Sequence, residues 1–513
     1  MSGRYLIVGQ HPIKENIETQ LRRANVEIDV YCLYEEVVYD ACVWEQIFIL
    51  TSPKVNDKIE EDRKAMSFLN RLAALPVSVK KRPIVHLLLQ CPVSLRILQT
   101  QDLPETVSDA FEVYPFTLED VWAKNVLVQM PGIKENSYPA LDGDGICSYS
   151  KNNVHVVISG FGSQAEVLAV HAALVAHYPN YHPQDERPIR TRITIVGDSI
   201  MDKCNSFIAK YRHLFDNSYY RIVDVVNKKV DFHYPMYHCK RSEFVDVEWE
   251  FVNKGICYPE VSRKINDWID SGTRQLSFFI SHDDDRVNLE ECMSLTAKIY
   301  EQEIPVFVKL HTKGVAEMLG SSMQYRIYPF GMVDCGYNIR QPLVRLAKLL
   351  KYFYNCSYGD AGVPTELPSD KVDEAWRKEK SLKKRFSNIY NVMTISSKMR
   401  SLGHDIGDFD TFYALTQDEI ETLSETEHNR WCVERLIQGM RPCTDEELNV
   451  IKEDIKSRKN EYKDRNIHYD LRAYDELEED ETGKNVKIYD YDLAACIPLM
   501  AKTFYEEIRH GTV

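Results

Sequence analysis

The sequence predicts an α/β fold in which two tandem doubly wound α/β domains are followed by a mainly α-helical domain. Short apolar runs alternate with helix-like stretches through residues 1–356. Segments rich in Gly, Pro, Ser and Asn interrupt this alternation, and a highly charged region with helical periodicity follows. A chain of 513 residues is also too long to fold around one hydrophobic core, because domains usually contain roughly 100–200 residues.

The first predicted domain covers residues 1–130 and has the pattern of a parallel sheet with helices between its strands. Its first turn, Gly9-Gln-His11-Pro-Ile-Lys14, has bulky residues where a phosphate-binding turn needs small ones. We therefore expect a degenerate Rossmann-like domain that serves dimerisation or packing, although Lys14 would also suit an anion. Residues 131–153 are predicted to be a linker. The expected strands are 5–8, 26–30, 47–50, 84–89 and 111–114.

The second predicted domain covers residues 154–356 and also alternates strands with helices. Residues 244–251 alternate strictly between apolar and acidic side chains, which is the period of a half-buried strand. Residues 340–354 are expected to form its closing helix. The remaining expected strands are 154–159, 192–196, 276–280 and 305–310.

A glycine turn follows the first strand of this second domain. Gly160-Phe161-Gly162-Ser-Gln-Ala165 matches the pattern GxGxxA, in which the glycines permit a tight turn and a close approach of a pyrophosphate. The next strand ends at Asp198, where an acidic side chain would accept the ribose hydroxyls. These residues predict a Rossmann-type nucleotide site, and the alternative is a turn retained for packing alone.

An acidic cluster, His282-Asp283-Asp284-Asp285, stands between the strand 276–280 and a helix. Ligands of open α/β sheets bind beside the carboxyl ends of strands, so His282 and Asp283 are candidate cofactor-binding residues. The alternative is that the acids cap the following helix. No metal site is expected, because further ligands at suitable spacing are not visible.

The third predicted domain covers residues 376–513, after a linker at 357–375. Thr416 and Glu419 form a capping box that should open a long helix, and Gly439 is placed to end it. Spacings of three and four residues bring several side chains of this helix to the face around Trp431. The cluster is either a satisfied buried network or a ligand site. Its members are Glu427, His428, Arg430, Trp431, Glu434 and Arg435.

Three segments of this region resemble the RyR domain, the repeat first named in ryanodine receptors: LSETEHNRWCVERLIQGMRP, HYDLRAYDEL and IYDYDLAACIPLMAK. The resemblance covers residues 376–505, and it departs at Gly439-Met440, where the family has Gly-Trp, and in a longer, charged stretch before His468. It implies a pocket for an adenine nucleotide or another small ligand. The implied ligand-binding residues are His428, Arg430, Trp431, Glu434, Arg435, Tyr474 and Asp475.

The middle domain is similar to the Trk-type NAD-binding domain of potassium-transport regulators. The similarity lies in GFGSQAE, RITIVGD and FFISHDDDRVNLEE, and it implies NAD or a related adenine nucleotide as cofactor. Because such domains commonly pair, it also implies a dimer. The combination of both domains implies a bacterial cytosolic ligand sensor, with phage defence as one setting.

The bulk composition agrees with a cytoplasmic protein. With 63 basic and 78 acidic residues the net charge is −15, which disfavours nucleic acid as a partner. The 13 cysteines show no CxxC pair, as expected for reduced thiols. We expect no signal peptide and no membrane insertion, because no apolar run reaches about 18 residues.

The expected function is a regulatory protein that senses a nucleotide or another small ligand. One alternative is an enzyme acting on NAD, either an oxidoreductase or an NAD-consuming defence effector, with His282 or Asp283 as acid or base. The sequence contains no GxSxG, Walker A, HExxH or kinase motif, so the catalytic residues of such an enzyme stay unknown and an enzyme is the less favoured reading. A scaffold without ligands is the third alternative.

Overall fold

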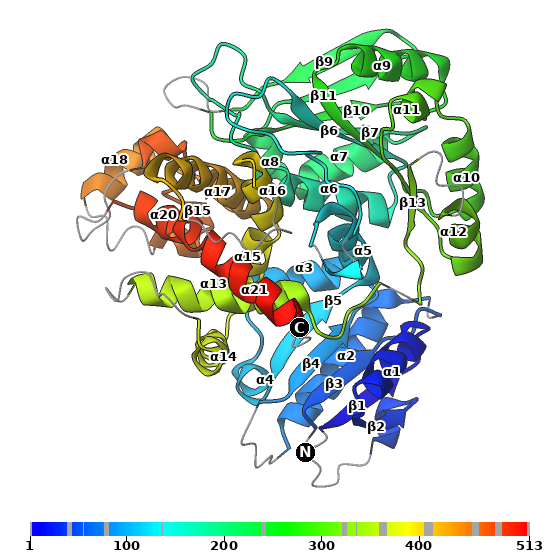
Figure 1. Cartoon of the computed structure of the whole chain (residues 1–513), viewed down its shortest axis with the longest axis vertical. Coiled ribbons are helices and arrows are strands. Elements are labelled where there is room, and N and C mark those ends of the chain that lie inside the picture. Colours follow the sequence, from blue (N-terminus) through cyan, green and yellow to red (C-terminus); the bar gives the residue numbers. More distant parts are fainter. Residues whose placement is uncertain are drawn as a thin grey trace.

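Two parallel-strand sheets with flanking helices and one group of helices make up the computed structural model (Figure 1). The first sheet lies at the bottom of the view, the second at the top, and the C-terminal helices lie beside both. The α/β class expected from the sequence is confirmed. The structure describes residues 3–37, 44–54, 56–75, 82–130, 132–134, 137–236, 243–320, 326–334, 336–358, 367–404, 414–453, 461–477 and 485–509.

The first sheet has five parallel strands in the order β2-β1-β3-β4-β5, and all five predicted strands are confirmed. The strands are β1 (Arg4–Gly9), β2 (Glu27–Tyr31), β3 (Gln46–Leu50), β4 (Ile84–Leu88) and β5 (Glu112–Phe116). The helices are α1 (Ile13–Arg23), the short η1 (Tyr34–Glu36), α2 (Lys58–Ala73), α3 (Pro92–Thr100), α4 (Glu105–Ala110) and α5 (Leu118–Leu127).

The first turn of this sheet is filled by protein. His11 is buried, and its Nδ1 accepts a hydrogen bond from the Ile13 amide at 3.1 Å. Burial lowers the pKa of His11 to about 4, so the ring is neutral at pH 7. A neutral ring bonded to an amide at the start of α1 is consistent with a turn that serves packing.

The second sheet has eight strands in the order β13-β12-β11-β6-β7-β10-β8-β9. When β8 and β9 are left out and the other six strands are numbered along the chain, their order from β10 to β13 is 3-2-1-4-5-6, the order of doubly wound sheets. Only β9 runs antiparallel among the described strands. The strands are β6 (Asn153–Ser159), β7 (Thr191–Val196), β8 (Tyr220–Asp224), β9 (Lys229–His233), β10 (Val247–Val252), β11 (Arg274–Ile280), β12 (Val306–Lys309) and β13 (Ile327–Phe330).

Helices connect the strands of the second sheet and cover it. Helix α6 follows the glycine turn, and its apolar face is buried: Ala165, Leu168, Ala169, Ala172 and, just after the helix, Ala176. The helices are α6 (Ser163–Val175), α7 (Met201–Lys210), α8 (Arg212–Asp216), α9 (Pro259–Asp270), α10 (Asp285–Met293), α11 (Ala297–Glu301) and α12 (Lys313–Gly320).

Strand β10 differs from the half-buried strand that the sequence predicts. Its acidic residue Glu250 is fully buried, because β10 lies inside the sheet between β7 and β8. Two cations neutralise the carboxylate: Arg221 of β8, whose Nε lies 2.7 Å away, and Lys264 of α9 at 2.8 Å. An alternating pattern thus marks an interior strand whose polar face is paired with basic side chains.

The predicted linker at 131–153 is packed between the units where the structure describes it. Arg400 binds the buried Asp142 carboxylate at 2.7 Å, and the Tyr138 hydroxyl donates to the Pro329 carbonyl at 3.0 Å. This segment therefore joins the C-terminal helices to the second sheet. In the second predicted linker, residues 359–366 lie outside the described residues.

The C-terminal unit is mainly helical, as the sequence predicts, and it also includes α13. The sequence places this helix in the second domain, but it packs on α14, α15, α20 and α21. The elements are α13 (Pro342–Tyr358), α14 (Ser369–Lys378), α15 (Leu382–Val392), α16 (Ile395–Ser401), α17 (Gln417–Ile437), α18 (Asp445–Glu453), α20 (Lys487–Ala495), α21 (Ile497–Arg509), β14 (Arg441–Pro442), β15 (Ile467–His468) and η4 (Tyr474–Glu476).

Helix α17 begins and ends where its sequence signals predict. Thr416 accepts a hydrogen bond from the Glu419 amide, and the Glu419 carboxylate accepts one from the Thr416 amide at 2.7 Å. Gly439 follows the helix with φ +90°, a left-handed conformation that favours glycine. The helix that carries the candidate ligand residues is therefore fixed at both ends.

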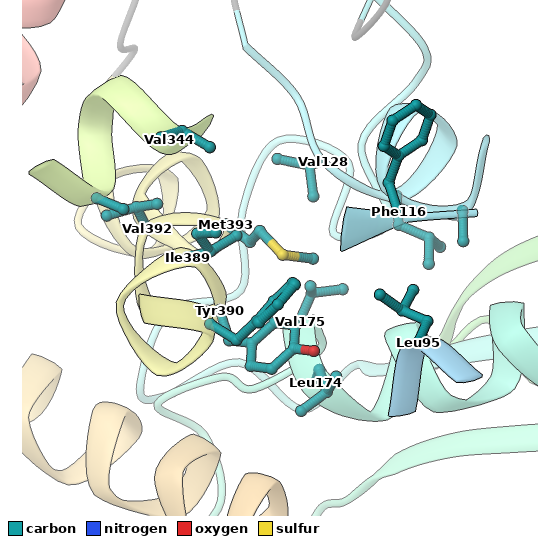
Figure 2. Close-up of a cluster of buried hydrophobic side chains, with 14 of the residues drawn as sticks. Leu95, Phe116, Val128, Leu174, Val175, Val344, Ile389, Tyr390, Val392 and Met393 are labelled. Carbon is teal, nitrogen blue, oxygen red and sulfur yellow. The ribbon is translucent and has the colours of Figure 1, made fainter. Parts of the chain in front are cut away.

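The three units share one hydrophobic core. Figure 2 shows side chains from α3, β5, α6, α13 and α15 pointing toward one another. Arg96 of α3 also donates to the carbonyls of Lys210 and Ile437, which belong to the second and third units. A movement of one unit therefore disturbs contacts of the others. The residues labelled there are Leu95, Phe116, Val128, Leu174, Val175, Val344, Ile389, Tyr390, Val392 and Met393.

Within the described part of the chain, the helices lack the combination of length and apolar character needed to cross a membrane. The same residues include no cluster of three His, Cys, Asp or Glu side chains suited to a metal ion.

Candidate functional site

The glycine turn lies at the carboxyl end of β6, between β7 and β11. Gly160 has φ +89°, and Ala165 is fully buried where α6 packs on the sheet. The Phe161 ring is buried against Phe207, with ring centroids 5.3 Å apart. The predicted turn geometry is therefore present, and the Phe161 ring packs in the protein interior, so that only the backbone of this residue contributes to the turn.

Two predicted cofactor residues lie directly over this turn. A methyl group at Gly160 would lie 2.9 Å from His282 Nδ1, and one at Gly162 would lie 2.9 Å from Asp283 Oδ2. Lys309, at the end of β12, is nearly buried, and its Nζ lies 3.3 Å from Asp283 Oδ1. The Asp283 carboxylate thus stands where the amides of a glycine turn would receive a phosphate, and a diphosphate would need this exposed side chain to move.

A polar network surrounds the same crevice. The Ser159 hydroxyl donates to Glu291 Oε2 at 2.6 Å, and His282 Nε2 lies 3.0 Å from the same oxygen. Asp198, at the end of β7 as predicted, is exposed and pairs with Lys254 at 3.1 Å. The structure therefore brings His282 and Asp283 against the turn and leaves Asp198 at its open side.

The next acid of the predicted cluster, Asp284, caps α10. It precedes the helix and accepts a hydrogen bond from the Arg286 amide at 2.8 Å. Asp285, in the first turn of α10, instead accepts a hydrogen bond from the His311 amide at 2.9 Å and contacts the His311 ring at 2.6 Å. The capping interpretation therefore holds for Asp284, and Asp285 links α10 to the segment after β12.

A second candidate site is a cavity of about 710 Å³ in the C-terminal unit, enclosed by α13, α15, α17, α20 and neighbouring loops. Four predicted residues, His428, Arg430, Trp431 and Arg435, line it. This volume lies within the range of roughly 300–1,000 Å³ typical of small-molecule sites. The α17 face that the sequence singles out therefore forms one wall of a ligand-sized cavity.

The charged floor of this cavity is neutralised within the protein. Arg430 is fully buried, with its guanidinium 2.8 Å from Glu427 and 2.9 Å from Glu434. Lys398 binds Glu427 at 2.6 Å. Burial alone would raise the pKa of Glu427, but Arg430 and Lys398 lower it to about 2. These four buried charges, which we call the α17 ion cluster, hold the wall in place.

His428 is held by acceptors on both ring nitrogens. Nδ1 lies 3.3 Å from Asp490 Oδ2 on α20, and Nε2 lies 2.9 Å from the Arg472 carbonyl. Burial would lower the pKa of His428, but Cys432 and Asp490 raise it well above its usual value. The contact with Asp490 ties α17 to α20. The Cys432 sulfur lies 3.4 Å from Nε2, but it is fully buried and outside the cavity wall.

Trp431 provides a flat, half-buried surface at the cavity. The Arg435 guanidinium lies 5.3 Å from its ring centre, and the His468 ring meets it edge-on at 4.9 Å. Burial lowers the pKa of Arg435, and the side chain still binds Gln438 at 2.8 Å. An indole ring beside a guanidinium suits stacking of a purine.

The remaining predicted residues, Glu434, Tyr474 and Asp475, lie outside the cavity wall. Glu434 belongs to the α17 ion cluster, and the Tyr474 ring lies 5.8 Å from the His428 ring. Asp475 is exposed and lies 3.7 Å from Lys487.

Sequence reasoning missed the opposite wall. Lys351 and Tyr354 come from α13, Lys384 comes from α15, and Lys463 comes from a helical turn at residues 461–464. Five Lys and Arg residues and His428 line the cavity of this acidic protein, against four acidic residues. Asp490 was visible only as part of the RyR resemblance, and no periodicity connects α13 with α17.

No protein-family model matches this chain, and searches of curated proteins and of solved structures found no significant match.

Proposed function

We propose that this chain is a cytosolic regulatory protein that senses a small ligand, and that its main ligand site is the cavity of the C-terminal unit. The observation that carries the proposal is the position of Trp431 beside the Arg435 guanidinium in a cavity of about 710 Å³ that is lined by more basic than acidic residues. The ligand that suits this wall is an adenine nucleotide, which combines an aromatic base with negative charge.

The two halves of such a ligand have separate partners in the wall. The half-buried Trp431 ring offers a face to the base, with Tyr354 and Tyr489 on other sides of the cavity. Lys351 and Lys384 share one acid, Glu379, at 3.1 and 4.0 Å, so this group retains an excess positive charge for phosphates. The RyR resemblance, which also implies adenine-nucleotide binding, supports the same ligand class.

The glycine turn is proposed as a second site, for NAD or a related nucleotide, in a Rossmann-like domain. The 3-2-1-4-5-6 strand order, the left-handed Gly160 and the terminal Asp198 support this assignment. The Asp283 carboxylate over Gly162 opposes it, because an anion at the turn would meet a like charge. We therefore rank this site below the cavity.

Ligand binding in the cavity would reach the other units through α17. This helix packs against α6 and α8, and its end accepts a hydrogen bond from Arg96 of the first unit. Coupling would arise if the ligand favoured one arrangement of these contacts. The proposed output is a change in how the three units pack.

An enzyme that acts on NAD is the second candidate function. The pair His282–Glu291 favours it, because a carboxylate that orients an imidazole beside a nucleotide site is a usual acid–base arrangement. Incubation with NAD followed by chromatography of the products distinguishes an enzyme from a sensor. A non-binding scaffold is the result that remains if no nucleotide binds at either site.

The test of the main site is isothermal titration of the full chain with ATP and ADP-ribose, with NAD as the probe of the second site. Trp431→Ala should weaken ATP or ADP-ribose binding at least tenfold, because base–aromatic stacking contributes roughly 1–3 kcal/mol. The matched control is Trp44→Ala, a half-buried tryptophan of the first unit. Equal affinity in the wild type and Trp431→Ala would contradict the assignment.

The second site has its own variant. Gly162→Asp places a second carboxylate at the turn, so NAD should no longer raise the melting temperature, while the ATP response stays unchanged. A loss of both responses would instead indicate general damage to the fold.

A further inference from the structure

The outermost strand of the second sheet has a row of exposed apolar side chains. Val230, Phe232, Tyr234 and Met236 are 41, 58, 61 and 67% exposed. Val230 and Phe232 share one face of β9, because alternate side chains of a strand point to the same face, and Tyr234 and Met236 continue this alternation beyond the last strand residue, His233. Large apolar residues in a row at a sheet edge are uncommon in a monomer, because they invite pairing.

Strand β9 is the last strand of its sheet among the described residues. It pairs with β8 through the antiparallel register Tyr220↔His233 to Asp224↔Lys229. Figure 1 shows it at the upper rim of the molecule, near α9. Among the described residues no strand pairs with its outer backbone edge, which lies in the plane of the sheet, and the apolar row stands on one face of the same strand.

We infer that this edge pairs with the same edge of a second copy of the chain, in antiparallel orientation across a twofold axis. The pairing would continue the eight-stranded sheet from one molecule into the next. The side chains of β9 are complementary to their own copies in this orientation, in addition to being apolar on one face.

The register follows from which residues stand opposite each other. With Phe232 opposite its own copy, Val230 lies opposite Tyr234, so apolar residues meet apolar residues. On the other face the same register places Asp231 opposite His233, an acid against a basic ring. Both faces are therefore satisfied at once.

Neighbouring registers are poorer. A shift by one residue would place apolar residues opposite the polar ones and so mix the two faces. With Asp231 opposite its own copy, two carboxylates would meet. With Val230 opposite its own copy, Phe232 would face Lys228. The Phe232 register is the one that the charges and the apolar row both favour.

Cysteine cross-linking tests the register in the full chain. Phe232→Cys places two thiols directly opposite each other, about 4.5–5.5 Å apart at their Cα atoms, which a disulfide can span. Val230→Cys separates them by four residues, or about 13 Å, which it cannot span. On mild oxidation we expect at least tenfold more disulfide-linked dimer from Phe232→Cys than from Val230→Cys or from the wild type, whose own cysteines set the background. Equal yields from both variants would overturn the inferred register.

Light scattering after size exclusion tests the interface itself. The wild type should run at twice its mass of 59.7 kDa, and Phe232→Lys should shift to the monomer. Met293→Lys, which changes another exposed apolar residue on α10, should remain a dimer. A monomeric wild type, or a Phe232→Lys variant that stays dimeric, would overturn the proposal. A monomeric chain with a peptide or another protein bound at this edge would also overturn the proposal.

Discussion

Replacing Arg430 with methionine would remove the central cation of the α17 ion cluster and keep a side chain of similar length. Arg430 makes four hydrogen bonds of 2.8–3.0 Å to Glu427 and Glu434, and all three side chains are buried. After the change Glu427 would keep Lys398, and Glu434 would keep the neutral donors Ser387 and Gln438 and the more distant Arg435, at 3.7 Å. The variant therefore leaves the buried Glu434 carboxylate without a cation within hydrogen-bond distance.

The cost follows from the loss of one partner in a buried cluster. Breaking a buried ion pair by removal of one partner costs about 3–5 kcal/mol in free energy of unfolding. Arg430 and Lys398 together lower the pKa of Glu427 to about 2, so both cations stabilise this carboxylate and only one of them would remain. We therefore expect Arg430→Met to lose about 3–5 kcal/mol.

Urea unfolding at pH 7, followed by circular dichroism, measures this loss. The control is Arg263→Met, because Arg263 binds Glu260 at 2.7 Å with the same three-residue spacing, but both side chains are exposed. The control should lose less than about 1 kcal/mol. A loss of that small size in Arg430→Met as well would refute the reasoning, because it would mean that the cluster contributes no more than a surface pair.

Three further predictions follow from single residues. The pKa of Glu427 is depressed in the folded state, so the stability that its carboxylate contributes is present above about pH 4.5 and disappears as the pH falls to about 2. The melting temperature of Glu427→Gln should therefore approach that of the wild type over this range. A difference that stays constant with pH would contradict this. Gly9→Ala should cost about 2 kcal/mol or more in urea unfolding, because its methyl group would lie 1.8 Å from the Leu50 carbonyl oxygen and the backbone has φ +114°. The control Gly272→Ala, whose methyl group would meet no atom within 4 Å, should cost about 1 kcal/mol. Equal losses in the two variants would argue against the clash. Asp283→Asn should tighten NAD binding about fivefold by calorimetry, because it removes a like charge beside the glycine turn, and unchanged affinity would mean that NAD does not reach the turn.

The sequence was sufficient where one local signal decides the outcome. The five strands of the first sheet followed from apolar runs, and the limits of α17 followed from Thr416 and Gly439. Neighbours on one helix face also follow from spacing, so His428, Trp431 and Arg435 could be placed in a common wall before their surroundings were known.

Other features depend on contacts between distant segments. Lys351 and Tyr354 reach the cavity because α13 packs on the C-terminal helices, although chain order suggested that it closes the second sheet. Glu250 is buried because the β8 hairpin extends the sheet beyond β10. The spacing of residues within one segment predicts neither the position of α13 at the cavity nor the burial of Glu250.

The glycine turn shows a different limit. Its pattern correctly gave a left-handed Gly160 and a buried Ala165, because these depend on the backbone. The position of Asp283 over Gly162 depends on where β11 ends and on its contact with Lys309. A motif can therefore indicate the shape of a phosphate site without indicating whether an anion already stands there.

Photoaffinity labelling with an 8-azidoadenosine nucleotide, followed by peptide mapping, tests most directly whether the C-terminal cavity receives a nucleotide. The account predicts label on peptides that contain Trp431, Tyr354 or Tyr489, with the label removed by an excess of unlabelled ATP. Label confined to the peptide with Gly160 and Ala165, or label that no unlabelled nucleotide displaces, would contradict it.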